Sequence, residues 1–200
     1  MNQFLNQLAG YKRVKQEFIE LLDMFHHQEK YEEQGAKLPS GILVYGEPGV
    51  GKTAMIRALL NASKRKTFEI ILDDVSAENA MNTSMKSTFD QAKKNGKSIV
   101  FIDDLDLILP EKDYGREHTN IELKYLLKEI DDSTHHDVIV IAAVNDIISL
   151  DDALVRSGRF DRKIKVDLPE DEDRKEIIHH YDDFRTFING CSDSYPCSFS

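Results

Sequence analysis

The sequence predicts an α/β protein, a three-layer sandwich in which a five-stranded parallel sheet carries helices on both faces. Short apolar runs alternate along the chain with longer segments of helical periodicity. Two of these runs, residues 99–102 and 138–144, are continuously apolar, which is typical of strands buried in a parallel sheet. A glycine-rich loop at residues 46–53 lies between a strand pattern and a helix pattern.

The N-terminal part is expected to form a long helix, a short helix and the first core strand. Residues 7–27 carry apolar side chains at close to helical spacing, which predicts an amphipathic helix, and Gly10 marks the turn before that helix. Residues 29–37 are polar and continue as a short helix, which Pro39-Ser40-Gly41 ends. The apolar, β-branched run at residues 42–45 then starts the sheet.

The middle of the chain continues the alternation of helix and strand. Residues 54–60 are good helix formers, and residues 68–72 read as a second strand. A helix is expected over residues 83–94, with Asn95-Gly96 as its C-cap. The buried strand at residues 99–102 follows it.

The last part supplies two more strands. A helix is expected over residues 116–130, followed by the strand at 138–144 and another at 163–166. A final helix is expected over residues 171–184. From residue 189 onward no periodicity remains, which predicts an unstructured tail.

The loop at residues 46–53 reads Gly-Glu-Pro-Gly-Val-Gly-Lys-Thr, which matches the phosphate-binding loop of nucleoside triphosphatases. Its glycines let the backbone curl around a polyphosphate, and the following helix adds the positive end of its dipole. Lys52 is expected to reach the β- and γ-phosphates, and the Thr53 hydroxyl to ligate Mg²⁺. The loop therefore predicts a P-loop nucleoside triphosphatase fold that binds a nucleotide together with Mg²⁺. The predicted nucleotide-binding residues are Glu47, Pro48, Gly49, Val50, Gly51, Lys52, Thr53 and Ala54.

Polar residues follow the third and fourth strand patterns. Asp103 comes directly after residues 99–102, where a carboxylate can hold Mg²⁺ directly or through water. Asp104 then faces the γ-phosphate and can deprotonate the attacking water. Asn145 ends the fourth strand, where its amide can hydrogen-bond the γ-phosphate or that water. Alone, these residues would fit solvated turns, but the phosphate-binding loop favours the catalytic interpretation.

A basic cluster, residues 156–162, includes Arg156 and Arg159. Guanidinium groups stabilise charge on a transferring phosphoryl group, in the same chain or in a neighbour. On spacing alone, ion pairs with nearby aspartates are an equal alternative. Those aspartates are Asp151, Asp152, Asp161 and Asp167.

Composition excludes several classes of protein. The chain has 200 residues, 40% hydrophobic and 31% charged, which suits a soluble domain with a real core. A net charge of −10 argues against nucleic acid as a main partner. The sequence lacks a run long and apolar enough for a membrane span, and its start does not resemble a signal peptide. Cys191 and Cys197 could pair, but a reduced tail is the simpler interpretation, so we expect a cytoplasmic protein.

Taken together, these residues resemble the AAA+ ATPases, and within them the FtsH-type membrane proteases and the proteasomal regulatory ATPases. The similarity covers about residues 6–180. Residues 29–39 look like the segment that leads into the Walker A loop of that group. Residues 101–106 look like its Walker B segment, and residues 138–162 like its second region of homology.

The resemblance implies roles and partners. Asn145 would be sensor 1, and Arg156 and Arg159 would be arginine fingers that complete the site of the next subunit. That arrangement implies a ring, usually a hexamer, made of this chain or of several. Leu8-Ala9-Gly10 matches the segment that touches the adenine. The function implied is hydrolysis of Mg-ATP within a ring-type protein-remodelling assembly, with a protein as the substrate of the ring.

The sequence departs from the family pattern at three places. Asp104 stands where the family has Glu, so its carboxylate is one methylene shorter, and a small misplacement lowers a rate steeply. Residues 76–82 contain no aromatic residue, where translocating members carry an aromatic pore loop. Only the first helix of the helical lid precedes the tail. These departures predict slow hydrolysis and leave an alternative open, a hydrolysis-deficient nucleotide-binding or regulatory module that docks on an active partner.

Three segments are expected. Residues 1–169 form the nucleotide-binding α/β domain, residues 170–188 begin a truncated helical lid, and residues 189–200 form the tail, with no protease domain. The Cys- and Ser-rich ending leaves a third alternative, a truncated gene product without an independent role.

Overall fold

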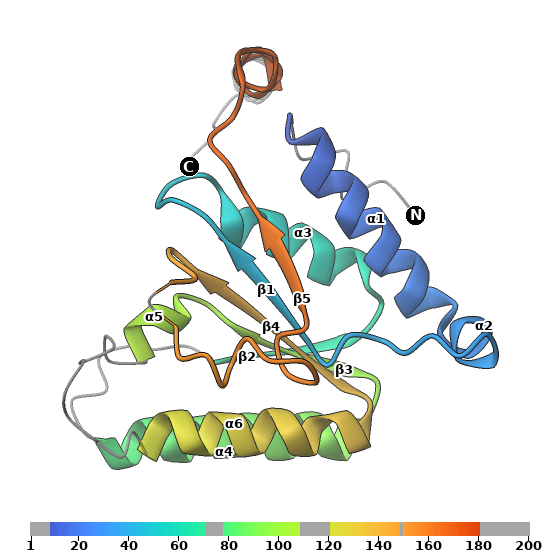
Figure 1. Ribbon diagram of the computed structural model, residues 1–200, viewed down its shortest axis with the longest axis vertical. Coiled ribbons are helices and arrows are strands. Elements are labelled where there is room, and N and C mark those ends of the chain that lie inside the picture. Colours follow the sequence, from blue (N-terminus) through green and yellow to red (C-terminus); the bar gives the residue numbers. More distant parts are fainter. Residues whose placement is uncertain (1–8, 71–77, 109–120, 149, 181–200) are drawn as a thin grey trace, which may run out of the picture.

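A parallel sheet of five strands forms the centre of the molecule, in the order β2-β3-β4-β1-β5 (Figure 1). The computed structural model describes residues 9–70, 78–108, 121–148 and 150–180. The strands are β1 (Gly41–Tyr45), β2 (Lys66–Ile70), β3 (Ser98–Ile102), β4 (Val138–Val144) and β5 (Arg162–Lys165). The helices are α1 (Lys12–His26), α2 (Gln28–Glu33), α3 (Lys52–Ala62), α4 (Glu78–Asn95), α5 (Leu105–Ile108) and α6 (Ile121–Ser133), with the 3-10 helix η2 (Thr134–His136). A further helix spans residues 171–180 and is called helix 171–180 below. The predicted fold class is confirmed.

Helices cover both faces of this sheet. α1 and α3 lie over one face, and α4 and α6 lie over the other (Figure 1). From β1 the chain crosses through α3 to the edge strand β2, then returns through α4 to β3 and through α6 to β4. Because β-α-β crossovers are right-handed, helices that connect strands in opposite directions must lie on opposite faces. The strand order therefore accounts for the three layers.

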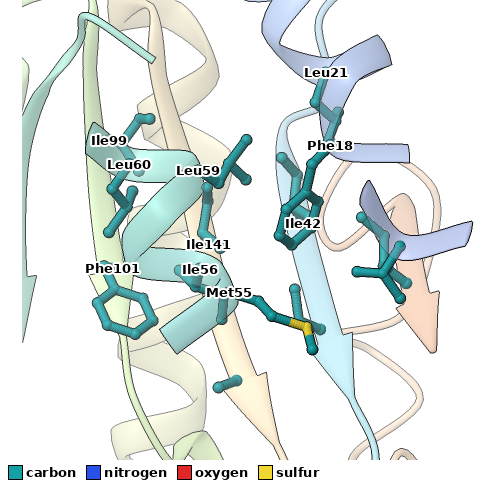
Figure 2. Close-up of a cluster of buried hydrophobic side chains, with 14 of the residues drawn as sticks. Phe18, Leu21, Ile42, Met55, Ile56, Leu59, Leu60, Ile99, Phe101 and Ile141 are labelled. Atoms are coloured by element: carbon teal, nitrogen blue, oxygen red, sulfur yellow. The ribbon is translucent and has the colours of Figure 1, made fainter. Parts of the chain in front are cut away.

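The face under α1 and α3 is closed by a cluster of apolar side chains (Figure 2). Phe18 of α1 and Ile42 of β1 are both 0% exposed. Ile56 and Leu59 of α3 are three residues apart, so they share one side of the helix, and both are fully buried. Burial of each such side chain contributes about 1.5–3 kcal/mol. This packing fixes α3, and the loop before it, against the sheet.

The opposite face is closed by α4 and α6. Phe89 of α4 and Leu126 of α6 are fully buried in a second apolar cluster. Lys93 of α4 connects the two helices, because its Nζ lies 2.6 Å from Oε2 of Glu129 in α6 and also contacts Asp132. The side chain of Lys93 is 12% exposed. This ion-pair cluster lies on the face away from α3.

The turn predicted at Gly10, before the first helix, is confirmed. α1 begins at Lys12 and not at residue 7, where the apolar pattern starts, because Gly10 and Tyr11 have φ angles of 66° and 56°. A left-handed backbone cannot continue into a right-handed helix. The C-cap predicted for α4 is confirmed: Gly96 has φ 60°, and its N–H donates to the carbonyl oxygens of Ala92 and Lys93.

Several other boundaries differ from the prediction by up to five residues; α2 ends at Glu33 and not at residue 37, and α6 ends at Ser133 and not at residue 130. β2 begins at Lys66, which pairs with Ser98 of β3, so pairing rather than local apolarity sets its start. α4 begins at Glu78, earlier than the expected residue 83. Because residues 78–82 are helical, they belong to α4 and not to the loop that was expected before it. The short helices α5 and η2 were not predicted.

Several predictions concern residues outside the described ranges. They are the end of the strand expected at residues 68–72, the start of the helix expected at 116–130, the end of the helix expected at 171–184, and the tail from residue 189 with both cysteines. Across the described ranges, none of the helices combines the length and the apolar character that a bilayer-spanning helix needs.

Candidate active site

The carboxyl ends of β1, β3 and β4 lie together at one edge of the sheet. Tyr45 pairs with Val144, and Ile102 pairs with Ala142. Ligands of open α/β sheets bind outside the carboxyl ends of the strands. The residues that follow these strands form the candidate site.

The glycine-rich loop connects β1 to the first turn of α3. Gly49 and Gly51 have φ angles of 83° and 92°, which cost glycine little. α3 begins at Lys52, so the positive end of its dipole lies at the loop, as an anion site requires. Among the predicted nucleotide-binding residues, Glu47, Pro48, Gly49, Gly51 and Ala54 are exposed, Thr53 is half-buried, and Val50 and Lys52 are buried.

Gly46 begins the loop where the backbone passes close to the chain after β5. A Cβ atom at this position would lie 2.1 Å from the carbonyl oxygen of Val166. Both segments are anchored, since the Gly46 N–H donates to the Val144 carbonyl (3.4 Å) and the Val166 N–H donates to the Tyr45 carbonyl (2.8 Å). Only glycine fits here, so the strands hold the start of the loop in place.

Gly46→Ala is expected to lower the free energy of unfolding by about 1–3 kcal/mol, the usual cost of overpacking. It should also weaken ATP binding, because the loop must shift. Chemical denaturation and a fluorescent-nucleotide titration measure the two effects. Gly35→Ala is the control, since Gly35 also has a positive φ (79°) but an added Cβ meets nothing within 4 Å. Equal nucleotide affinity in the two variants would contradict the role of the Val166 contact.

Lys52 is buried, with only 6% of the residue exposed. Its Nζ donates to the carbonyl oxygens of Gly46 (2.8 Å) and Glu47 (3.1 Å) and to Oδ1 of Asn145 (2.8 Å). The three ammonium protons therefore all have acceptors, which offsets the cost of burying the charge. The third bond joins the loop to the end of β4.

Asp106 of α5 holds Asn145 in place. Its Oδ2 accepts hydrogen bonds from the backbone N–H (3.0 Å) and the side-chain Nδ2 (2.9 Å) of Asn145. The amide oxygen of Asn145 is thereby turned toward Lys52. The other oxygen of Asp106, Oδ1, is buried without a hydrogen-bond partner among the described residues. Asp106 was not predicted as a site residue, and its only sequence signal is its place close behind Asp104.

Thr53 and Asp103 lie side by side. The Thr53 hydroxyl donates to Oδ1 of Asp103 at 3.1 Å. A hydroxyl from α3 and a carboxylate from the end of β3 are hard oxygen ligands, which Mg²⁺ prefers alongside water and phosphate oxygens. The chemistry of this pair therefore fits Mg²⁺.

Asp104 follows Asp103 and is exposed, with a φ angle of 48°. Aspartate tolerates this left-handed conformation better than most residues. The pKa of Asp104 lies above its ordinary value, chiefly through partial desolvation of its carboxyl group and then through the charges of Asp103 and Asp106, with Lys52 opposing them. A raised pKa makes the carboxylate a stronger base toward water.

The two predicted arginine fingers have different surroundings. Arg159 forms a two-point ion pair with Asp131 of α6, with Nε and one terminal nitrogen each 2.8 Å from a carboxylate oxygen. This hydrogen bonding holds the pKa of Asp131 below its ordinary value. The partner lies 28 residues away in the chain and is none of the aspartates that spacing suggested. Arg156 is exposed, and within the described part of the chain its side chain makes no hydrogen bond or ion pair.

The segment expected to touch the adenine lies just before α1. Ala9 is half-buried and Gly10 is buried. The N–H of Gly10 donates to Oε2 of Glu176 in helix 171–180 at 3.1 Å. The next residue, Tyr11, donates its hydroxyl hydrogen bond to the Val50 carbonyl in the phosphate loop at 2.9 Å.

The fold and this edge of the sheet define a P-loop ATPase domain. Residues 42–168 match the family model AAA, the ATPase family associated with various cellular activities. The chain belongs to the AAA family of ATPases, which bind nucleotide. The predicted resemblance to AAA+ ATPases is confirmed.

Within that family, the chain is similar to bacterial FtsH proteins. It is 39% identical to the ATP-dependent zinc metalloprotease FtsH 3 of Symbiobacterium thermophilum over 180 residues, which are 86% of this chain and 29% of that protein. It is 38% identical to FtsH of Borreliella burgdorferi over 182 residues, 86% of this chain and 28% of the relative. FtsH 1 of Alkaliphilus metalliredigens is 35% identical over 181 residues, 87% of this chain and 31% of the relative. The chain thus spans less than a third of the length of these proteins.

Proposed function

We propose that this chain is an ATPase module of a ring-type protein-remodelling assembly, and that it binds Mg-ATP and hydrolyses it slowly. The observation that carries the proposal is a pair of contacts at one sheet edge. Lys52 contacts Asn145, and Thr53 contacts Asp103. These contacts bring the loop after β1 to the ends of β3 and β4, as phosphoryl transfer to water requires.

Each of these side chains has a role in the proposed reaction. Lys52 binds the β- and γ-phosphates through charge-assisted hydrogen bonds, which replace bonds that its Nζ makes to protein acceptors in this structure. Thr53 and Asp103 would hold Mg²⁺, which would neutralise phosphate charge when bound. Asn145 orients the attacking water through its amide oxygen, and Asp104 accepts the proton of that water. The γ-phosphorus forms a bond to the water oxygen while its bond to the terminal oxygen of the leaving ADP breaks.

The proposed boundary between the nucleotide-binding domain and the lid lies after β5, at residue 169. Residues 1–169 would form the nucleotide-binding domain, with Ala9 and Gly10 at the adenine, and residues 170–188 would begin a helical lid. Helix 171–180 supports this division, because it follows β5 and contacts the segment before α1 through Asp173 and Glu176.

A ring would place arginines of one subunit at the nucleotide of the next. Arg156 suits this role because it is exposed and its side chain is unengaged in the described part of the chain. Arg159 is held by Asp131 and by a hydrogen bond to the Ala153 carbonyl at 2.8 Å. Arg159 would therefore have to exchange these bonds in order to act across a subunit boundary.

A second candidate function is a nucleotide-holding module that does not hydrolyse ATP and docks on an active partner. The observation that favours it is the position of Asp104. This residue has a short side chain, its backbone is in the left-handed conformation, and it is exposed. Such a carboxylate can fall short of the water that it must deprotonate.

Steady-state ATP hydrolysis over a protein concentration series tests the first function against the second. We expect specific activity to rise with concentration, because the site is completed by a neighbour. Arg156→Ala should lower turnover by roughly 10³-fold, the lower end of the effect of an arginine finger, with an unchanged unfolding midpoint. Arg159→Ala should lower both, because it also leaves Asp131 without its partner. Background turnover at every concentration, with measurable ATP binding, would favour the nucleotide-holding module.

A further inference from the structure

Tyr11 connects three segments that are far apart in the chain. Its backbone N–H donates to Oδ1 of Asp173 in helix 171–180 at 2.8 Å. Its hydroxyl donates to the carbonyl oxygen of Val50 in the phosphate loop at 2.9 Å. The residue itself stands immediately before α1. Its two hydrogen bonds therefore join helix 171–180 to the loop.

The backbone around Tyr11 has an unusual conformation that permits these contacts. Tyr11 has a φ angle of 56°, a conformation that is rare for an aromatic residue. Gly10 precedes it, and a Cβ atom on Gly10 would lie 2.9 Å from Cβ of Asp173, so glycine alone allows this approach. The N–H of Gly10 donates to Glu176, one turn further along helix 171–180. Two carboxylates of one helix thus hold two successive N–H groups.

These carboxylates also stabilise the start of α1. The first turn of α1, residues 12–15, reads Lys-Arg-Val-Lys and holds no acidic residue. Basic residues are unfavourable at the positive end of a helix dipole. Asp173 and Glu176 supply the missing negative charge from another helix, and Lys12 lies 3.5 Å from Glu176. The position of helix 171–180 and the start of α1 are therefore coupled.

The bond to Val50 sets the direction of a loop peptide. In a trans peptide, the carbonyl of one residue and the N–H of the next point in opposite directions. With the Val50 carbonyl held by Tyr11, the Gly51 N–H points away from Tyr11, on the other side of the loop backbone. Val50 is only 5% exposed and packs in the core, whereas Gly51, with φ 92°, would let this peptide rotate if Tyr11 did not hold it. Burial, followed by the charge of Asp173, raises the pKa of Tyr11, so its hydroxyl remains a donor.

We propose that Tyr11 is a positioning residue, which locks the Val50–Gly51 peptide with its N–H toward the phosphates and couples that peptide to helix 171–180. This inference rests on the proposed function, because it assigns the loop to a nucleotide. Phosphates that bind the Gly51 N–H then favour the orientation that Tyr11 already holds. By linkage, nucleotide binding stabilises the contacts of Tyr11 with Asp173.

The test compares Tyr11→Phe with Tyr31→Phe in a titration with a fluorescent ATP analogue and Mg²⁺. Tyr31 is the matched control, because its hydroxyl makes one hydrogen bond, to Asp23 at 2.7 Å, between α1 and α2. One neutral hydrogen bond corresponds to an affinity change of roughly 2- to 10-fold. We expect Tyr11→Phe to lose affinity by this factor and Tyr31→Phe to keep the affinity of the parent.

Amide hydrogen exchange supplies a readout that general destabilisation does not imitate. In the parent chain, Mg-ATP should slow exchange in helix 171–180, and in Tyr11→Phe this protection should be lost while Tyr31→Phe retains it. Parental affinity and parental protection in Tyr11→Phe would overturn the inference and leave the proposed function standing. Absence of nucleotide binding by the parent chain would overturn the proposed function itself.

Discussion

Lys52→Ala is expected to weaken ATP binding by at least about 100-fold. Charge-assisted hydrogen bonds contribute about 1.5–3 kcal/mol each, and we propose that Lys52 makes them to two phosphates. At about 1.4 kcal/mol per tenfold change, their loss corresponds to roughly 10²- to 10⁴-fold. The substitution also removes the donor that Asn145 and the Gly46 and Glu47 carbonyls share. A fluorescent-nucleotide titration measures the effect.

Lys93→Ala is the matched control for this variant. Lys93 is also largely buried and also has hydrogen-bond acceptors, but it joins α4 to α6 on the opposite face of the sheet. We expect Lys93→Ala to lower the unfolding midpoint and to keep nucleotide affinity. Unchanged affinity in Lys52→Ala would refute the assignment of the phosphate-binding loop.

Asp104→Glu is expected to raise the turnover number, on the order of 10- to 100-fold. The additional methylene extends the carboxylate toward the water, and a misplacement of about 1 Å can cost about 10²-fold in rate. The backbone opposes the change mildly, because φ 48° suits aspartate better than glutamate. Steady-state hydrolysis at saturating Mg-ATP measures the gain.

Asp104→Asn distinguishes the length of the side chain from its ability to accept a proton. It keeps the size of the side chain and its compatibility with the left-handed backbone but removes the base, so turnover should fall to background while ATP affinity is retained. An Asp104→Glu variant that is no faster than the parent would mean that the shortened acid does not limit the reaction. Incomplete assembly of the ring would then be the step to test.

The fold was predictable because its signals are local. The buried strand β3 and the glycines of the phosphate loop can each be recognised from a few neighbouring residues. A buried strand requires a continuous apolar run, and a left-handed turn requires glycine. The start of β2 was not predictable in this way. Lys66 is exposed and polar, and it is a strand residue only because Ser98 of β3 lies beside it.

The same distinction holds for the candidate site: the sequence indicated the site residues but not the side chains that hold them. Residue type and spacing alone indicated Lys52, Thr53, Asp103, Asp104 and Asn145. Sequence spacing could not find Asp131 as the partner of Arg159, or Asp106 as the residue that holds Asn145. It also could not find the bonds from Tyr11 to Val50 and Asp173, which join positions 39 and 162 residues apart. The backbone conformation of a single turn depends on the residues of that turn. These side-chain partners, by contrast, come into contact only after the sheet and its helices have packed.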